Sequence, residues 1–370
     1  MPIYLDHAAT SPLRPEAREA FLRASEMGGN ASSVHSIGRK AKLTLEEARN
    51  DVLTAVGAIG IGGLVFTSGG TEANALALHQ ASGFDYTVMS AGEHDSLYGA
   101  VKDAVIAPLT ANGDVDLKGL EGLLTRDGRP FVCVMLANNE TGVINPIAEV
   151  AALVHACGGW LHVDAVQALG KMTIDFDALG ADSLSLSAHK VGGPQGVGAL
   201  IYNRDRTITA LITGSGQELG MRAGTENIPG ISAFAAAVRT AHAVDLTAQA
   251  TVEKQLKALG VWIMGEGAPR VPGILCIAQP HWVSSLQLIH MDMAGICVSS
   301  GSACSSGKVK ASRVIAAMGQ ANEAERIDFA DKVLRISSGW TTAPADWQAF
   351  FDIWSKGYEV YLKRHAKEVA

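Results

Sequence analysis

The stretch that decides the fold reads SLSLSAHKVGGPQGVG, from Ser183 to Gly198. A short β run, Ser183–Ser187, leads directly to His189 and Lys190 and then to a glycine-rich turn. Ligands of α/β proteins bind where strands end, so this stretch presents a hydroxyl, an imidazole and an amine at the edge of a sheet. Most lysines are solvated surface residues, and Lys190 alone would be interpreted as one. A buried, reactive lysine needs partners elsewhere in the chain.

Strands and helices alternate on both sides of this stretch. Apolar β runs are expected at 64–66, 86–90, 131–137, 160–163, 184–187 and 199–202. Helices fit at 15–27, 36–56, 97–105, 117–124 and 147–157. Nearly continuous apolar strands that alternate with helices predict a mainly parallel sheet covered on both faces, and therefore an α/β fold.

The helix expected at 36–56 has a clear apolar face. Apolar residues from Ile37 to Val56 recur at steps of three to four, and Arg49 lies off that face. This spacing is typical of an amphipathic helix. In contrast, the long loop 213–227 is punctuated by glycines and has no core pattern, which is typical of functional or disordered loops.

Polar residues follow four of the expected strands. They are Glu93 and His94, 138–141, 164–167, and Ser187 with His189 and Lys190. A fifth strand passes through Gly69, Gly70 and Thr71 into a helix, and free N–H groups at such a helix start favour a phosphate. Thr71 could equally be an ordinary helix N-cap. No Gly-Lys-Ser/Thr follows, so the turn is not a P-loop.

Composition narrows the class of protein. A chain of 370 residues is long enough for two domains. The formal charge of −7 carries no basic block, so neither nucleic acid nor an anionic membrane is expected as a partner. We find no apolar run that could span a bilayer and no leader sequence, and therefore expect a cytoplasmic protein.

The five cysteines predict neither disulfides nor a structural metal site, because none forms a C-x-x-C pair or a zinc spacing. Cys133, Cys157, Cys276 and Cys297 lie in apolar segments, and we expect them to be buried as small hydrophobic residues. Cys304 differs, because serines and glycines surround it from 299 to 307. It is a candidate for an exposed, reactive thiol, although Ser/Gly loops are also common connections.

Seven motifs follow one another along the chain. They are Gly69–Glu72, Glu93-His94, Asn138–Glu140, Asp164–Gln167, Ser187–Lys190, Arg222–Asn227 and Ser299–Cys304. In this order they resemble the cysteine desulfurases of the NifS/IscS type, which are pyridoxal-phosphate enzymes of the class V aminotransferase group. The resemblance extends from Tyr4 to about Ser337.

The resemblance implies a fold and an assembly. The fold is that of PLP-dependent transferases of fold type I, with a mainly parallel seven-stranded sheet in the large domain. We expect that large cofactor-binding domain at 13–246, and a smaller α+β domain at 1–12 and 247–370 that carries the Cys304 loop. The resemblance also implies a homodimer in which Thr225 completes the phosphate site of the other subunit.

The resemblance also implies roles for individual residues toward pyridoxal 5′-phosphate. Lys190 would bind the cofactor aldehyde covalently and later move protons. Asp164 would pair with the pyridinium nitrogen, and His94 would stack on the ring and assist proton transfer. The remaining residues implied to bind the cofactor are Gln167 and Asn139 at the ring oxygen, and Gly70, Thr71, Ser187, His189 and Thr225 at the phosphate. Arg335 would hold the substrate carboxylate, with Asn139 and Asn30 nearby.

The implied activity is a sulfur transfer. L-cysteine would be converted to L-alanine, with the sulfur taken up as a persulfide on Cys304 and passed to an acceptor protein such as an iron–sulfur scaffold. The acceptor pathway would be iron–sulfur cluster assembly or thiolation. Two alternatives remain open: another class V enzyme, such as a selenocysteine lyase or an aminotransferase, and a non-catalytic assembly subunit.

Overall fold

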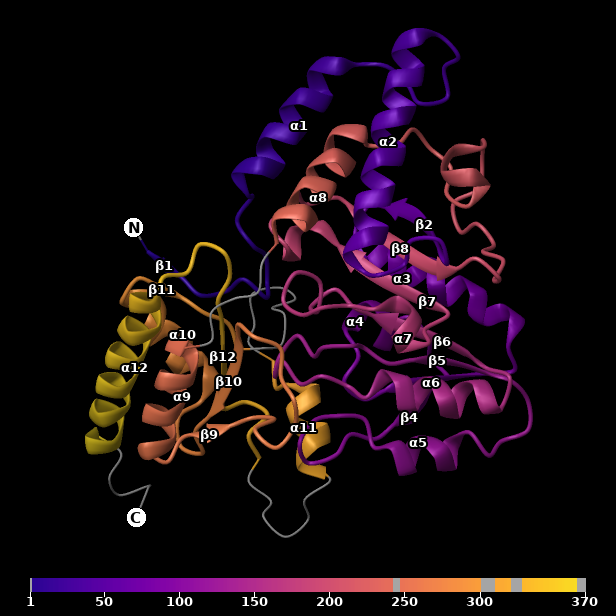
Figure 1. The fold of residues 1–370 in the computed structure, drawn as a ribbon. Helices are drawn as coiled ribbons and strands as arrows, with labels where there is room; N and C mark the ends of the chain where they lie inside the picture. Colours follow the sequence, from indigo (N-terminus) through magenta and orange to yellow (C-terminus); the bar gives the residue numbers. More distant parts are fainter. Residues whose placement is uncertain (1, 242–246, 301–309, 321–327, 365–370) are drawn as a thin grey trace.

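The computed structural model describes residues 2–241, 247–300, 310–320 and 328–364, and its centre is a seven-stranded sheet (Figure 1). The strand order is β2-β8-β7-β6-β5-β3-β4. The bounds are β2 (Gly62–Thr67), β3 (Tyr86–Ser90), β4 (Val105–Ala107), β5 (Pro130–Cys133), β6 (Trp160–Asp164), β7 (Ser183–Ser187) and β8 (Gly198–Asn203). Only β8 runs antiparallel to its neighbours, β2 and β7. The predicted α/β fold with a mainly parallel sheet is confirmed.

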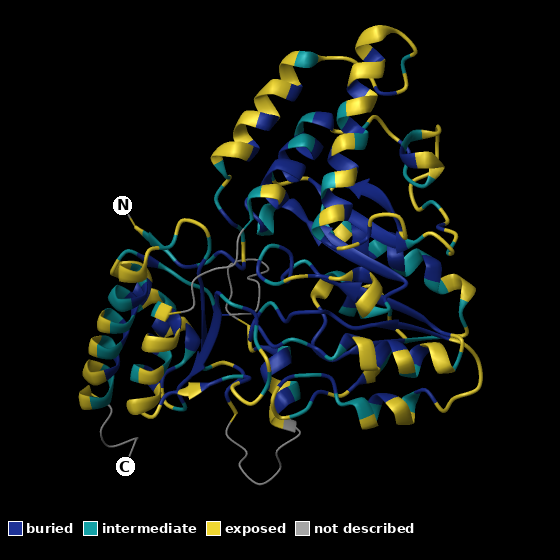
Figure 2. Ribbon diagram, viewed as in Figure 1, coloured by how far each residue is buried: buried dark blue, intermediate teal, exposed yellow. Residues whose placement is uncertain are grey.

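Both faces of this sheet are covered by helices. Leu184 and Leu186 of β7 belong to one apolar cluster, which includes residues of the helices on that side. Val65 of β2 and Phe131 of β5 point to the opposite face and pack with α3 and α4. The helix bounds are α1 (Pro15–Met27), α2 (Ser36–Ala55), α3 (Gly70–His79), α4 (Asp95–Tyr98), α5 (Leu117–Leu123), α6 (Ile147–Ala156), α7 (Phe176–Leu179) and α8 (Ile228–Thr240). Figure 2 shows the strands as the buried layer between exposed outer helix faces.

The prediction of a helix at 97–105 is wrong. Helix α4 ends at Tyr98, and Val105–Ala107 instead forms β4, which pairs in parallel with β3. At the sheet edge, pairing with β3 satisfies the backbone N–H and C=O groups of this segment that are directed at β3. The sequence reading missed this strand because three apolar residues are too short to show a period.

The predicted faces of helix α2 are wrong at two positions. Arg49, expected off the apolar face, is buried, whereas Ile37, expected on that face, is 52% exposed. Arg49 forms a two-pronged ion pair with Glu218, from Nη1 to Oε2 at 3.0 Å and from Nη2 to Oε1 at 3.1 Å. The N–H of Phe66 donates to the same carboxylate. Glu218 and Leu219 have positive φ angles of 45° and 57°. Residues other than glycine adopt this backbone conformation rarely, and only where the surrounding structure holds them in it. The loop 213–227 is therefore anchored to the core at Glu218.

A second unit is built on a three-stranded antiparallel sheet of order β12-β10-β9. Its strands are β9 (Trp262–Ile263), β10 (Ile274–Ala278) and β12 (Val333–Ser337), and its helices are α9 (Thr247–Ala258), α10 (Ser284–Met293) and α12 (Pro344–Arg364). The chain start joins this unit, since β1 (Ile3–Tyr4) pairs in parallel with β11 (Ile296–Cys297) and Leu5 lies in its core (Figure 1). The boundary predicted at residue 246 falls outside the described residues and stays a prediction.

Helix α11 (Arg313–Gln320) connects the two units. Val314, Ile315 and Met318 pack with Leu109 of the large sheet region and Cys276 of β10. The site described below lies between these units, and this apolar contact helps to fix their relative position.

Four cysteines are described, and all four are free thiols. Cys133 and Cys276 are buried as predicted, but Cys157 and Cys297 are only partly buried. Cys157 is the C-cap of α6, and Cys297 lies in a two-stranded sheet, so neither is enclosed on all sides. Cys304 lies outside the described residues. No helix in the described ranges has both the length and the apolar character needed to cross a membrane.

Candidate active site

The carboxyl ends of β2, β3, β6 and β7 open into one cavity of about 480 Å³. It lies at the edge of the large sheet and also receives residues from the chain start and from β12. The residues that line it are Asp6, Ala8, Ala9, Gly70, Thr71, Asn74, His94, Ser96, Met135, Asn139, Asp164, Val166, Gln167, Ser187, His189, Lys190, Ser299 and Arg335. Segments far apart in the sequence therefore meet at the place where parallel sheets bind ligands.

Most residues predicted from the sequence line this cavity. They are Gly70, Thr71, His94, Asn139, Asp164, Gln167, Ser187, His189, Lys190 and Arg335. Asn30 does not; it lies on an exposed turn after α1, where its Oδ1 accepts from the N–H of Ser32. Thr225 is exposed and does not line the cavity of its own chain either. Cys304 lies outside the described residues.

Lys190 follows β7 on a short 3₁₀ turn that directs its amine to the chain start. Its Nζ donates to the carbonyl oxygens of Ala8 and Ala9, each at 2.7 Å. Burial, followed by the positive charge of Arg335, lowers the pKa of Lys190 to about 8. A lysine with this pKa supplies the neutral amine that a nucleophile requires at a pH near neutrality far more readily than an exposed lysine does.

Asp164 ends β6 with a buried carboxylate. Its Oδ1 accepts from the N–H of Val166 at 3.0 Å, and its Oδ2 accepts from Nδ2 of Asn74 at 2.8 Å. Both oxygens thus have one fixed donor and retain further acceptor capacity toward the cavity. This is the arrangement needed to hold a protonated ring nitrogen.

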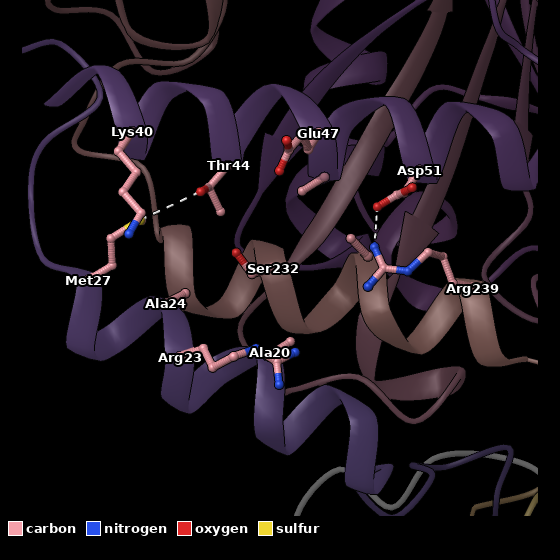
Figure 3. Close-up of a pocket in the computed structure, with 12 residues that line it drawn as sticks. Ala20, Arg23, Ala24, Met27, Lys40, Thr44, Glu47, Asp51, Ser232 and Arg239 are labelled. Carbon is pink, nitrogen blue, oxygen red and sulfur yellow. Dashed lines mark hydrogen bonds and ion pairs between the residues drawn. The ribbon is translucent and has the colours of Figure 1, made fainter. Parts of the chain in front are cut away.

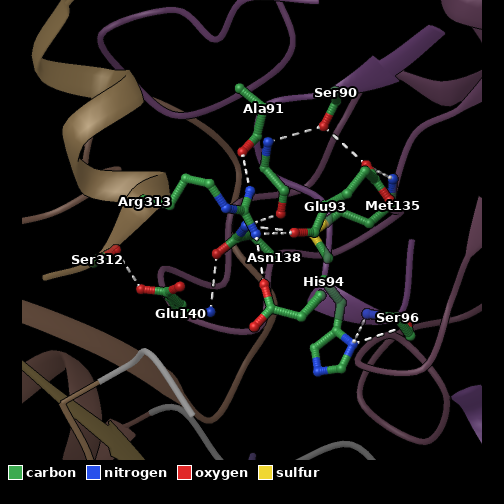
Figure 4. Close-up of polar contacts among 12 residues, drawn as sticks. Ser90, Ala91, Glu93, His94, Ser96, Met135, Asn138, Glu140, Ser312 and Arg313 are labelled. Atoms are coloured by element: carbon green, nitrogen blue, oxygen red, sulfur yellow. Dashed lines mark hydrogen bonds and ion pairs between the residues drawn. The ribbon is translucent and has the colours of Figure 1, made fainter. Parts of the chain in front are cut away.

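His94 lies at the N-cap of α4, and its loop is held from the opposite unit by α11 (Figure 4). Nη1 of Arg313 donates to the carbonyl of Ala91, and Nη2 donates to the carbonyl of Glu93, both at 2.8 Å. Ser312, at the start of the same helix, donates to Glu140 at 2.5 Å. The helix that follows the Cys304 segment in sequence is thereby tied to the loop that carries His94.

Glu93 is a buried carboxyl group beneath that loop. Its Oε1 accepts from Ser90 Oγ and from the N–H of Met135, each at 2.8 Å, while its Oε2 has no partner among the described atoms (Figure 4). Burial, followed by the negative charge of Asp164, raises the pKa of Glu93 to about 8. Glu93 is therefore largely protonated at neutral pH and leaves Asp164 as the carboxylate of the site.

The start of α3 and the end of β7 form the predicted phosphate seat. Gly69, not Thr71, is the N-cap of α3, and no side chain caps this helix. A Cβ atom on Gly70 would lie 2.9 Å from Val166 and 3.4 Å from the Cβ of Ser187, so only glycine permits this close approach. The first N–H groups of α3 are left available, and they and the adjacent Ser187 and His189 can bind an anion.

Gln167 has a partner that the sequence analysis missed. Lys171, one turn further along, is buried and donates from Nζ to Oε1 of Gln167 at 3.1 Å. Because the carbonyl of Ala8 only accepts, Gln167 presents Nε2 to it, at 2.9 Å, and turns its oxygen toward Lys171. Burial, followed by the charge of Lys190, lowers the pKa of Lys171 to about 7. No periodic pattern marks such a residue.

Arg335 projects from the middle of β12 and is nearly buried. Nη1 donates to the carbonyl of Asn139 and Nη2 to Oδ1 of Asp6, both at 2.8 Å. Its Nε has no partner among the described atoms. The guanidinium group is therefore held in place while several of its five N–H groups remain available to a carboxylate.

These residues fit pyridoxal 5′-phosphate. The cavity supplies an amine of lowered pKa for the aldehyde, a carboxylate for the ring nitrogen, an amide donor for the ring oxygen and an anion seat at a helix start. Among the described residues, no cluster of three or more His, Cys, Asp or Glu side chains could hold a metal ion.

A second hollow, of about 360 Å³, lies between α1, α2 and α8 (Figure 3). Its charged groups include Arg239 and Asp51, which pair with each other, and its Thr44 contacts Met27. It is lined by helix residues alone, so no strand end opens into it as in the first cavity.

Comparison with known proteins identifies the family. Residues 3–349 match the model of the family described as "Aminotransferase class-V". The chain is 38% identical over 364 residues to a cysteine desulfurase of Cereibacter sphaeroides, with 92% of each chain covered. It is 34% identical over 378 residues to the cysteine desulfurase IscS of Dictyoglomus turgidum, covering 95% of this chain and 93% of that protein. The chain belongs to the aminotransferase class-V family.

The solved structures agree. A NifS-like protein from Rickettsia africae superposes with a TM-score of 0.86 at 34% identity, covering 97% of this chain and 100% of that one. The resemblance to NifS/IscS-type proteins drawn from the motifs, and the fold type I architecture that it implied, are confirmed. Enzymes of this family use pyridoxal 5′-phosphate, which is the cofactor of this chain.

Proposed function

We propose that this chain is a cysteine desulfurase that transfers the sulfur of L-cysteine to the thiol of Cys304. The observation that carries this proposal is the convergence of Lys190, Asp164 and Arg335 on one cavity. An amine of lowered pKa, a buried carboxylate and a fixed guanidinium group are what an amino acid and a pyridoxal cofactor require together. Relatives named cysteine desulfurase, at 34–38% identity over most of the chain, support the choice of substrate.

The cofactor supplies an electron sink, because its protonated ring accepts the electron pair released at the substrate Cα. Asp164 keeps the ring nitrogen protonated, with its own carboxylate fixed by Val166 and Asn74. Gln167 would offer the second hydrogen of Nε2 to the ring oxygen, in the orientation that Ala8 and Lys171 support. The α3 start, with Ser187 and His189, holds the phosphate.

Lys190 anchors the cofactor and then moves protons. With the cofactor and substrate bound, the Lys190 amine would be the group that takes the Cα proton and returns it, and its lowered pKa, about 8 in this structure, suits it to that role. His94 assists at the face of the ring. Arg335 holds the substrate carboxylate, which orients the Cβ–S bond toward the side of the cavity that Cys304 must reach.

The sulfur step balances without an external oxidant. The Cys304 thiolate forms a bond to the substrate sulfur while the Cβ–S bond breaks, and the electron pair stays on the substrate carbon. Proton transfer to that carbon gives the methyl group of L-alanine, and Cys304 becomes a persulfide. A thiol acceptor protein can then take the outer sulfur by exchange.

Three finer proposals accompany this function. The chain acts as a homodimer in which Thr225 reaches the phosphate of the partner subunit; its exposure and its absence from the cavity of its own chain support this. The persulfide passes to an acceptor for iron–sulfur cluster assembly or thiolation. The compartment is the cytoplasm. A non-catalytic role is not favoured, since the ten predicted residues named above line the cavity.

The test is to incubate the purified, cofactor-loaded protein with L-cysteine and to measure alanine and sulfide with and without a reductant. We expect alanine in both cases and sulfide release chiefly with the reductant, which cleaves the persulfide. Cys304→Ala should keep the colour of the bound cofactor and lose alanine formation. Unchanged turnover in Cys304→Ala would overturn the role of this cysteine.

A further inference from the structure

A buried asparagine on α3 links two site residues that the proposed mechanism uses separately. Asn74 is 1% exposed and lies in the first turns of the helix that starts at the phosphate seat. Its Nδ2 donates to Oδ2 of Asp164 and to Oγ of Ser96, both at 2.8 Å. Its Oδ1 lies 3.0 Å from Nε2 of His162. All the hydrogen-bonding groups of this side chain are therefore engaged.

The direction of the first bond is fixed by Asp164. A carboxylate only accepts hydrogen bonds, so the amide must present Nδ2 to it and turn Oδ1 away. Were the amide reversed, two oxygens would face each other in a buried site, which costs free energy for both. The amide orientation thus follows from the charge of Asp164.

The hydrogen bonds on the Oδ1 side of Asn74 agree with this amide orientation. Trp160 only donates, and its Nε1 gives its hydrogen to Oγ of Ser183 at 3.0 Å. The Ser183 hydroxyl, 2.9 Å from Nδ1 of His162, can then donate to that nitrogen. Burial lowers the pKa of His162 to about 3, so the ring is neutral and carries its hydrogen on Nε2, facing Asn74 Oδ1. Asp164 therefore requires this amide orientation, and the His162 end is compatible with it.

The second hydrogen of Asn74 helps to orient a hydroxyl that contacts His94. Because Ser96 Oγ accepts from Asn74, its own hydrogen is free to go to Nδ1 of His94, which lies 2.9 Å away (Figure 4). The backbone N–H of Ser96 donates to the same nitrogen at 3.1 Å. Nδ1 is thus an acceptor, and a neutral His94 must carry its hydrogen on Nε2. No protein partner is seen for Nε2 among the described residues.

We propose that Asn74 is a positioning residue that couples Asp164 to His94: it fixes the Asp164 carboxylate toward the cofactor ring and, through the Ser96 hydroxyl, adds a second donor to the backbone N–H that holds His94 as the Nε2–H tautomer. The roles of Asp164 and His94 rest on the proposed function. The consequence is that one defined ring nitrogen, Nε2, meets the cofactor or substrate, and that it meets them as a donor. Replacing Asn74 disturbs both residues at once although it reacts with neither.

The experiment compares two variants. Asn74→Leu keeps the size of the side chain and removes its hydrogen bonds, whereas Ser96→Ala removes only the hydroxyl that lies between Asn74 and His94. Gln249→Met is the matched control, because Gln249 is a buried amide in the small unit that bonds Gly273 and Ile274. Cofactor affinity and the pH dependence of the visible cofactor band are measured without any cysteine. ¹⁵N NMR of labelled histidine, with His94→Asn for assignment, reports the tautomer directly.

We expect Asn74→Leu to bind pyridoxal phosphate about tenfold more weakly and to shift the pH dependence of the band, because a charge-assisted hydrogen bond to Asp164 is lost. Ser96→Ala should leave affinity near that of the wild type and keep His94 as the Nε2–H tautomer, because the backbone N–H at position 96 still donates to Nδ1, but the Nδ1 signal should shift as the hydroxyl donor is lost. An Nδ1–H signal for His94 in the wild type would overturn the proposal even if Asn74→Leu failed to fold. So would an Asn74→Leu protein that behaves like Gln249→Met. A protein that shows the expected tautomer but makes no alanine from cysteine would reject the proposed function alone.

Discussion

Arg335→Lys tests how the substrate is recognised, because it keeps the positive charge and removes the planar group. In the structure two of the five N–H groups of Arg335 are directed to Asn139 and Asp6, which fixes the plane of the guanidinium group. The remaining N–H groups, Nε–H among them, can hold a carboxylate by two parallel bonds. A lysine offers one point of contact and has no such plane.

The expected loss is one charge-assisted hydrogen bond, or about 1.5–3 kcal/mol. This corresponds to a decrease of about 10- to 100-fold in kcat/KM for alanine formation from L-cysteine. Affinity for pyridoxal phosphate, measured from its absorbance, should stay within about twofold of the wild type, since this role of Arg335 concerns the substrate.

Arg335→Leu should act more strongly and in a second way. The charge of Arg335 helps to lower the pKa of Lys190, so its removal should raise that pKa and move the pH dependence of cofactor attachment upward. Arg270→Lys is the matched control, because Arg270 pairs with Glu253 in the small unit and does not line the cavity. The reasoning is refuted if Arg335→Lys retains full kcat/KM, or if its main defect is loss of the cofactor.

Three further predictions concern the core and the lysines. Glu218→Gln removes the buried charge partner of Arg49 and leaves only the half-exposed Glu46, so it should lower the free energy of unfolding by about 3 kcal/mol in urea titrations. Glu19→Gln on the exposed face of α1 should change it by less than about 1 kcal/mol, and equal effects would contradict the buried pair. The rate at which apoprotein attaches pyridoxal phosphate should rise with pH through about 8 and then level off, because the lowered pKa of Lys190 makes the neutral amine dominant above that pH; a midpoint near 10.5 would show an unperturbed lysine. Lys171→Met should weaken pyridoxal phosphate binding by about 2- to 10-fold in absorbance titrations, since Gln167 loses the donor that orients its amide, and unchanged affinity would count against that role.

The sequence predicted the site better than it predicted the edges of the fold. Strand ends could be found because buried parallel strands are nearly continuous apolar runs and the polar residues after them stand out, as at Asp164 and Lys190. Strand β4 could not be found, because its three residues acquire their backbone partners only by pairing with β3. Its assignment depends on a neighbour that is distant in sequence.

Buried polar residues were the second gap. Periodicity assigns charged and amide side chains to the solvent, so Arg49, Lys171 and Asn74 gave no signal, although all three are buried in the structure. Arg49 and Asn74 are held by partners that only the fold brings near, Glu218 and Asp164. The partner of Lys171 is Gln167, four residues away, but only the fold buries the pair. The sequence therefore reveals the polar residues that follow strands and line the cavity more readily than the buried polar residues that orient them.

The measurement that tests the central claim most directly is mass spectrometry of Cys304 after a single turnover. Cofactor-loaded protein is mixed with less than one equivalent of L-cysteine without reductant, and alanine is counted in the same sample. The account predicts one alanine for each sulfur atom gained by the peptide that contains Cys304, with no sulfur on Cys157 or Cys297, which are the partly buried cysteines among the four that the structure describes. Alanine formed without added sulfur on Cys304, or sulfur on another cysteine in the Cys304→Ala protein, would contradict it.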